Sequence, residues 1–170
     1  MCTAYHEAGH AVAACAMQRP IAEVSIIADL DSRGRCVHRP WPSSLPRGIE
    51  IEREESRRLE AEIITCLAGD VAQARLTGWG DSPGAESDME AALAIAFVVA
   101  KGGRGEAEAY VKQLRARTED LLRRPRVWAA VKALAAELLR HQRVGAKQAQ
   151  RIITKAIRGK EGSRSLPITW

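Results

Sequence analysis

Apolar side chains recur every three or four positions at the start of the chain, the spacing at which residues share one face of an α-helix. The recurring positions are Tyr5, Ala8, Val12, Cys15 and Ala16. Thr3 can cap the start of such a helix, and Pro20 cannot continue one. The pattern therefore predicts a helix over about residues 3–18.

Shorter, β-branched segments come next and indicate extended chain. Residues 23–28 are β-branched and apolar, residues 29–34 are rich in turn formers, and residues 35–38 form a second extended piece. Two short strands joined by a turn predict a small β-hairpin. Residues 39–48 contain three prolines, so we expect an irregular surface loop there.

A long helical pattern occupies residues 49–76, which begin polar and become amphipathic. Its apolar stripe consists of Leu59, Ile63, Cys66, Leu67, Val71 and Ala74. Residues 77–85 then hold three glycines and a proline, which makes this segment a candidate for a functional loop. Ser87 can cap a further helix that runs to about residue 101 and carries Asp88 in its first turn.

Three more helices are predicted near residues 105–124, 126–141 and 146–158, separated by Pro125 and Gly145. Aromatic residues make up only 4% of the chain, so the core must be built from small and aliphatic side chains, which suits closely approaching helices. The predicted fold class is mainly α (α+β). The length of the chain favours one compact domain over residues 1–159, with residues 160–170 as a C-terminal tail.

The net charge of +5 raises the alternative of a nucleic-acid-binding protein. The densest basic run is interleaved with Glu119 and Asp120, however, so we expect a solvated helix face and no nucleic-acid partner. No apolar run reaches the length of a membrane span, and the first residues lack the pattern of a secretory signal, which predicts a cytoplasmic location. The four cysteines include no C-x-x-C pair, which argues against a cysteine zinc site and against a disulfide framework.

The first predicted helix contains the sequence His-Glu-Ala-Gly-His at residues 6–10, which is an H-E-x-x-H motif. His6 and His10 lie one turn apart on the same helix face, so both imidazoles can bind one zinc ion. Glu7 lies beside them and can act as the general base towards a zinc-activated water. Gly9 costs helix stability relative to alanine, which indicates that another backbone approaches closely at that position.

A catalytic zinc site needs a third protein ligand. The short-spacer route to a third histidine is closed, because residues 13 and 16 are both alanine. Asp88 and Glu90, which follow the glycine-rich segment, are the carboxylate candidates, and His38 is a weaker one. Asp88 could equally be a carboxylate that only complements the helix dipole, so the residues alone leave the choice open.

Several segments together resemble the FtsH-type AAA zinc metalloprotease family. Residues 3–12 resemble its active-site helix, residues 24–27 with Gly34 resemble its short strands, and residues 84–90 resemble its G-A-S-N-D-L-E block. Residues 136–153 are similar to its closing helices. One departure is Gln73, which stands where the family usually has an acidic residue.

The resemblance implies a compact helical metallopeptidase domain in which Zn²⁺ is held by His6, His10 and Asp88, with Glu7 as the catalytic base. It also implies that the peptide substrate binds along the second predicted strand, formed by Arg35, Cys36, Val37 and His38. The physical basis is β-augmentation, in which backbone groups of the strand bind an extended peptide.

The predicted function is that of a zinc-dependent metallo-endopeptidase that hydrolyses unfolded or extended polypeptides. The chain contains no phosphate-binding loop and no counterpart of the family's ATPase or membrane segments, so we expect its activity to be independent of ATP. The alternative is a peptide-binding or adaptor module with weak or no catalysis. Polypeptide substrates are the expected partners, and a homo-oligomer or a separate ATPase partner stays open.

Overall fold

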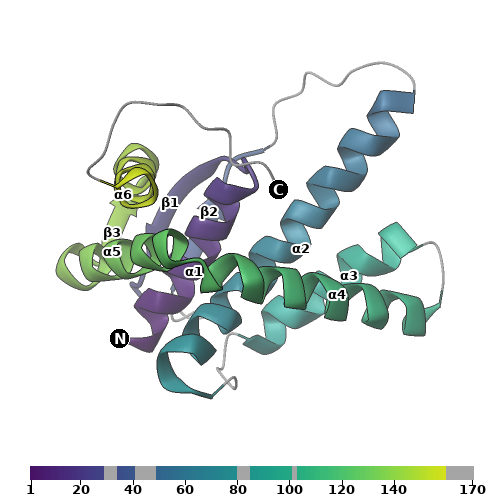
Figure 1. Ribbon diagram of the computed structural model, residues 1–170, viewed down its shortest axis with the longest axis horizontal. Coiled ribbons are helices and arrows are strands. Elements are labelled where there is room, and N and C mark those ends of the chain that lie inside the picture. The colour runs from purple at the N-terminus through teal and green to yellow at the C-terminus, as the bar shows by residue number, and fades with distance from the viewer. Residues whose placement is uncertain (29–33, 41–48, 80–84, 101–102, 160–170) are drawn as a thin grey trace.

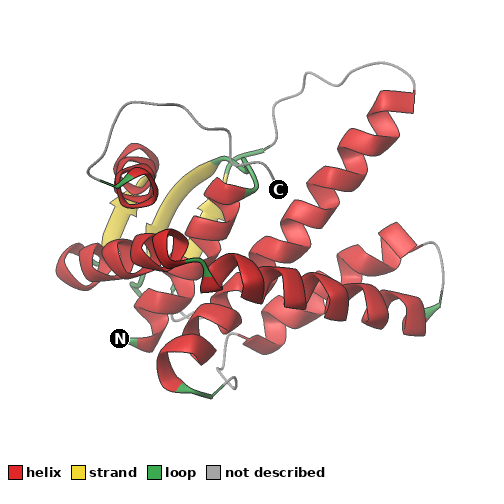
Figure 2. Cartoon of the chain, viewed as in Figure 1, coloured by secondary structure: helices red, strands yellow, loops and turns green. Residues whose placement is uncertain are grey.

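The computed structural model describes residues 1–28, 34–40, 49–79, 85–100 and 103–159. Helices dominate this part of the chain, and a small antiparallel sheet accompanies them (Figure 2). The elements, in chain order, are α1 (Cys2–Ala16), β1 (Ile21–Ser25), β2 (Arg35–His38), α2 (Ile49–Thr77), α3 (Ala85–Ala100), α4 (Arg104–Arg123), α5 (Pro125–His141), β3 (Arg143–Gly145) and α6 (Ala146–Arg158). The mainly α (α+β) fold class is confirmed.

Helix α1 runs through the middle of the molecule, with the sheet and α6 on one side and α2, α3 and α4 on the other (Figure 1). Most of its residues are buried, and many of them are alanines, which lets neighbouring helices approach closely. A Cβ atom added at Gly9 would lie 2.4 Å from the carbonyl oxygen of Ala68 in α2. The close approach of another backbone at Gly9 is therefore confirmed.

The predicted hairpin is confirmed, because β1 and β2 pair antiparallel. The predicted bounds of its first strand are wrong, since β1 covers Ile21–Ser25 and residues 26–28 lie outside it. The Ser25 hydroxyl accepts a hydrogen bond from the Ile27 amide at 3.2 Å, so the chain turns after Ile26, whose amide still donates to the carbonyl of Gln142. The sheet also has a third strand that the sequence pattern did not predict, and its order is β2-β1-β3.

Two helix ends also differ from the prediction. Helix α1 stops at Ala16, because Gln18 adopts a left-handed conformation (φ 59°) and the amide of Arg19 donates back to the carbonyl of Ala14. Helix α3 begins at Ala85, so Ser87 lies inside its first turn and is not the residue that precedes the helix. The prediction that Asp88 lies in the first turn is confirmed.

Several basic residues of α4 form ion pairs with acidic residues of α2 or of α4 itself. Arg115 pairs with Asp70 of α2, Arg117 with Glu60 of α2, and Arg123 with Asp120 of its own helix. Within the described residues no helix combines the length and the apolar character that a membrane crossing requires. Most of the loops predicted at residues 29–34, 39–48 and 77–85, and the whole of the tail at 160–170, lie outside the described residues.

Candidate metal centre

Helix α1 brings two imidazoles and one carboxylate into the interior. His6, Glu7 and His10 are 8%, 5% and 7% exposed. The rings of His6 and His10 meet edge to face with their centroids 4.6 Å apart, and their Nε2 atoms are 3.0 Å apart. Residues four apart stack on one helix face, so the helix itself holds the two nitrogens together.

Asp88 joins this pair from the first turn of α3. Its Oδ2 lies 3.1 Å from His6 Nε2 and 3.2 Å from His10 Nε2. Among the described residues, these three side chains form a group whose potential ligand atoms all lie within 4.8 Å of one another. The other two candidates for a third ligand lie elsewhere, since Glu90 is exposed and His38, in β2, is outside the group.

The contacts of this group suit a metal ion better than a hydrogen-bonded cluster. Oδ2 of Asp88 is buried and has no hydrogen-bond partner of good geometry among the described residues, although two ring nitrogens lie close to it. Tetrahedral zinc with bonds of about 2.0–2.2 Å separates its ligand atoms by roughly 3.3–3.5 Å. The observed triangle, with edges of 3.0, 3.1 and 3.2 Å, is close to that size. The residues present therefore fit a tetrahedral cation with one position left open.

Helix α2 packs against the rings of His6 and His10, and the sequence pattern did not predict these contacts. Nδ1 of His10 donates a hydrogen bond of 2.7 Å to the backbone carbonyl of Thr65, which leaves Nε2 as the nitrogen that faces Asp88. A Cβ atom added at Gly69 would lie 2.3 Å from Nε2 of His10 and 2.7 Å from Cε1 of His6. Only glycine at position 69 leaves room for both imidazoles.

Burial and mutual charge set the protonation of the group. Burial raises the pKa of Glu7 above its ordinary value, and the charges of His10 and His6 offset part of that rise. Burial alone would raise the pKa of Asp88 as well, but the short contacts with His10 and His6 hold it well below its usual range. Burial would lower the pKa of His10, but Asp88 and Glu7 raise it overall. The carboxylate of Asp88, which contacts both imidazoles, is therefore ionised, whereas the carboxylate of Glu7 is the more basic of the two.

Strand β2 carries the four residues predicted to bind substrate, and it is an outer strand of the sheet. Arg35 and Val37 are exposed, whereas Cys36 and His38 are half-buried, as the alternation of a strand requires. Burial, followed by the charges of Arg19 and His10, lowers the pKa of His38 to about 4, so this imidazole is neutral near pH 7. Burial raises the pKa of the Cys36 thiol, which excludes a reactive thiolate there.

The first residue before β2 lies directly against the candidate base. A Cβ atom added at Gly34 would lie 2.9 Å from Oε1 of Glu7 and 2.9 Å from Cγ2 of Thr3. The absence of a side chain at position 34 thus lets the start of β2 approach the carboxylate of Glu7. Gly34 carries a signal in the sequence, since it directly precedes the predicted substrate-binding strand, whereas Gly69 lies far in sequence from every predicted site residue.

Residues 1–104 match the pattern that defines peptidase family M41. This match covers His6, Glu7, His10 and Asp88 and all of β2. The chain belongs to peptidase family M41. No curated protein matches the chain.

Membership of family M41 confirms the predicted resemblance to the FtsH-type peptidase domain over the matched residues. The similarity of residues 136–153 to that family's closing helices lies beyond the match. M41 peptidases depend on a metal, and in this chain the group of His6, His10 and Asp88 could hold it.

Proposed function

We propose that this M41 chain is a zinc-dependent metallo-endopeptidase that cleaves unfolded or extended polypeptides without ATP. The observation that supports it most is the triangle of His6 Nε2, His10 Nε2 and Asp88 Oδ2 with a second, buried carboxylate beside it. His6, His10 and Asp88 would hold the metal, and two imidazoles with one carboxylate are a common set for catalytic zinc.

When bound, the metal supplies a water molecule whose pKa is lowered towards about 7. Glu7 accepts a proton from that water as its oxygen attacks the carbonyl carbon of the peptide bond. As the carbon–nitrogen bond breaks, Glu7 gives the proton to the leaving nitrogen, and the products are an amine and a carboxylic acid, which releases the second proton of the water to solvent and becomes a carboxylate. The raised pKa of Glu7 suits this role, because a general base acts best when its pKa lies near the working pH.

The substrate would bind along β2 as an additional strand. An outer strand can pair with an extended peptide through backbone hydrogen bonds, which makes few demands on side chains. The approach of Gly34 to Glu7 places the start of β2 next to the proposed base. A peptide paired with Arg35, Cys36, Val37 and His38 would thus lead its backbone towards the metal ligands.

Cleavage of matched unfolded and folded substrates tests this function. An unstructured polypeptide should be cut without ATP, and the same sequence held in a stably folded domain should survive, because only its small unfolded fraction is accessible. A chelator should abolish cleavage and added zinc should restore it. Glu7→Gln should bind zinc normally and cleave at least about 10²-fold more slowly, the usual contribution of a general base. Products are resolved by mass spectrometry, and zinc is measured by elemental analysis.

The result that would contradict the proposal is a zinc-loaded parent protein that cuts none of a broad panel of unfolded chains. Binding of those chains without cleavage would instead assign a peptide-holding or adaptor role. Unchanged turnover in Glu7→Gln would assign the base to another residue.

A further inference from the structure

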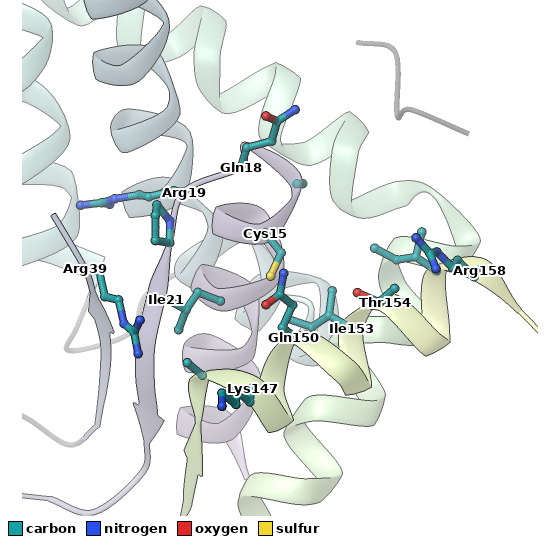
Figure 3. Close-up of a pocket in the computed structure, with 14 residues that line it drawn as sticks. Cys15, Gln18, Arg19, Ile21, Arg39, Lys147, Gln150, Ile153, Thr154 and Arg158 are labelled. Atoms are coloured by element: carbon teal, nitrogen blue, oxygen red, sulfur yellow. The ribbon is translucent and has the colours of Figure 1, made fainter. Parts of the chain in front are cut away.

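A cavity lies at the C-terminal end of α1, away from the imidazole pair. It has a volume of about 680 Å³ and lies between the last residues of α1, the start of β1 and the exposed side of α6 (Figure 3). Small-molecule sites commonly have volumes of about 300–1,000 Å³, so the cavity is large enough for a ligand. It shares no lining residue with the metal centre or with strand β2.

The charges around this cavity are all positive. Arg39, Lys147 and Arg158 line it, and no aspartate or glutamate does. These three cations form no ion pair with any acidic residue in the described part of the chain. Arg19 also lines the cavity, but its guanidinium is directed to Glu62 of α2, 3.4 Å away. An anion in this cavity would therefore meet cations that form no ion pair with the described residues.

Two of the three cations approach the start of β1 from opposite sides. Arg39 directly follows β2, and its amide donates to the carbonyl of Pro20 at 2.9 Å. Lys147 follows Gly145, which pairs with Glu23 on the other side of β1. Figure 3 shows Arg39 and Lys147 on either side of Ile21. They provide a guanidinium and an ammonium group at one end of the cavity, a combination that suits phosphate oxygens.

The backbone adds partial positive charge at the end of the cavity where Arg39 and Lys147 lie. Ala146 and Lys147, the first residues of α6, line the cavity, and no side chain caps the start of that helix. The first amide groups of a helix carry partial positive charge and bind anions. The first turn of α6 also contains no acidic residue that would compete for these amides.

The middle of the cavity is less polar. Ile21 and Ile153 are buried and form part of its wall, and Cys15 and Gln150 point towards one another there (Figure 3). Burial raises the pKa of Cys15 to about 11, so its thiol is neutral near pH 7 and does not offset the cations.

We propose that this cavity binds a small soluble organic phosphate. The phosphate group lies between Arg39, Lys147 and the start of α6, and an apolar or aromatic part lies against Ile21 and Ile153. The site is separate from the peptidase centre and takes a ligand of a different chemical class from the polypeptide substrate.

Titration calorimetry with 1-naphthyl phosphate as the probe tests this site. The parent protein should bind it saturably, and the uncharged 1-naphthol should bind at least about tenfold more weakly, because it cannot form the charge-assisted hydrogen bonds. The double variant Arg39→Gln/Lys147→Gln should weaken binding of the phosphate by about tenfold or more. Both residues are exposed, so the variant should fold as the parent does.

The matched control is Arg151→Gln/Lys155→Gln, which removes the same charge from exposed positions of α6 that do not line the cavity. Its affinity for 1-naphthyl phosphate should equal that of the parent. Equal losses of affinity in both double variants would show that net charge alone explains the effect, and this result would overturn the proposal. The absence of saturable binding at millimolar concentrations of the probe would overturn it too. Binding to vesicles that contain phosphatidic acid, without binding of the soluble phosphate, would overturn it in favour of a lipid headgroup.

Discussion

At the scale of single residues, the position of Asp88 decides the chemistry of the proposed metal centre. Its carboxylate lies in the first turn of α3, where unpaired amide groups favour negative charge, and both imidazoles approach the same oxygen. Glu90 is two positions further along the helix and exposed. Two carboxylates close together in sequence thus have different surroundings, which makes them a matched pair for a test.

The parent protein should bind roughly one zinc ion per chain. Asp88→Ala should weaken zinc binding by more than about 100-fold, since loss of even an outer-shell partner costs about 10- to 100-fold. Glu90→Ala should leave the affinity unchanged. A competition titration against a chelator measures both, and the reverse ranking would assign the ligand to Glu90.

The residues of this centre differ in how far the sequence could predict them. The spacing of His6 and His10 predicted that they share a helix face with Glu7 beside them, because that relation is local. The choice among Asp88, Glu90 and His38 depends on how α3 and β2 pack against α1, which no local pattern specifies. The carbonyl of Thr65 could not be predicted at all, since every residue has a backbone carbonyl.

At the scale of elements, the crossing of α1 and α2 shapes the site. Gly9 in α1 and Gly69 in α2 each lie where an added Cβ atom would collide with the other helix. At Gly69 the collision is with the imidazoles themselves, and the ring of His10 is anchored by its bond to Thr65. The contact between the two helices and the room for a metal therefore depend on the same residue.

Gly69→Ala should lower zinc affinity by more than about tenfold, because the methyl group displaces ring nitrogens that must stay within bonding distance of the metal. Gly105→Ala in α4 is the control, since nothing lies within 4 Å of an added Cβ atom there. That control should keep full zinc affinity and gain up to about 1 kcal/mol in stability from the better helix propensity of alanine. Normal zinc affinity in folded Gly69→Ala would contradict this account.

The helices were predictable because each repeats an apolar spacing over many residues, and five of them begin and end within about two residues of the predicted bounds. Strand β3 was not predictable, because it has only three residues and exists through its pairing with β1. The same pairing extends to the amide of Ile26, which donates to the carbonyl of Gln142. Short strands depend on distant partners, so their presence and bounds are properties of the tertiary structure.

At the scale of the whole molecule, α2 connects the metal centre to the helices beyond it. It packs against α1, α3 and α4, and Asp70, next to Gly69, forms an ion pair with Arg115 of α4. The nitrogen Nη2 of Arg115 donates to Oδ2 of Asp70 at 2.6 Å. Asp70 is 5% exposed, whereas the side chain of Arg115 is 31% exposed. The two partners therefore differ in how easily each could return to water.

This asymmetry predicts unequal costs for removing either partner. Arg115→Ala should lower the free energy of unfolding by about 3 kcal/mol or more, because it leaves a buried carboxylate without a cation. Asp70→Ala should cost only roughly 1–2 kcal/mol, since Arg115 can turn to solvent and to Glu119, which lies 3.7 Å away. Urea denaturation with a chelator present measures both without any contribution from metal binding.

The double variant and a surface control complete the test. Arg115→Ala/Asp70→Ala should be about as stable as Asp70→Ala alone, because the arginine matters chiefly through the carboxylate that it neutralises. Arg117→Ala, which removes a more exposed pair with Glu60, should cost less than about 1 kcal/mol. If Asp70→Ala proved as costly as Arg115→Ala, the carboxylate would have a second role in the fold. Oδ1 of Asp70, which has no hydrogen-bond partner among the described residues, would then be the atom to investigate, since it is buried beside the helix crossing that supports the histidines.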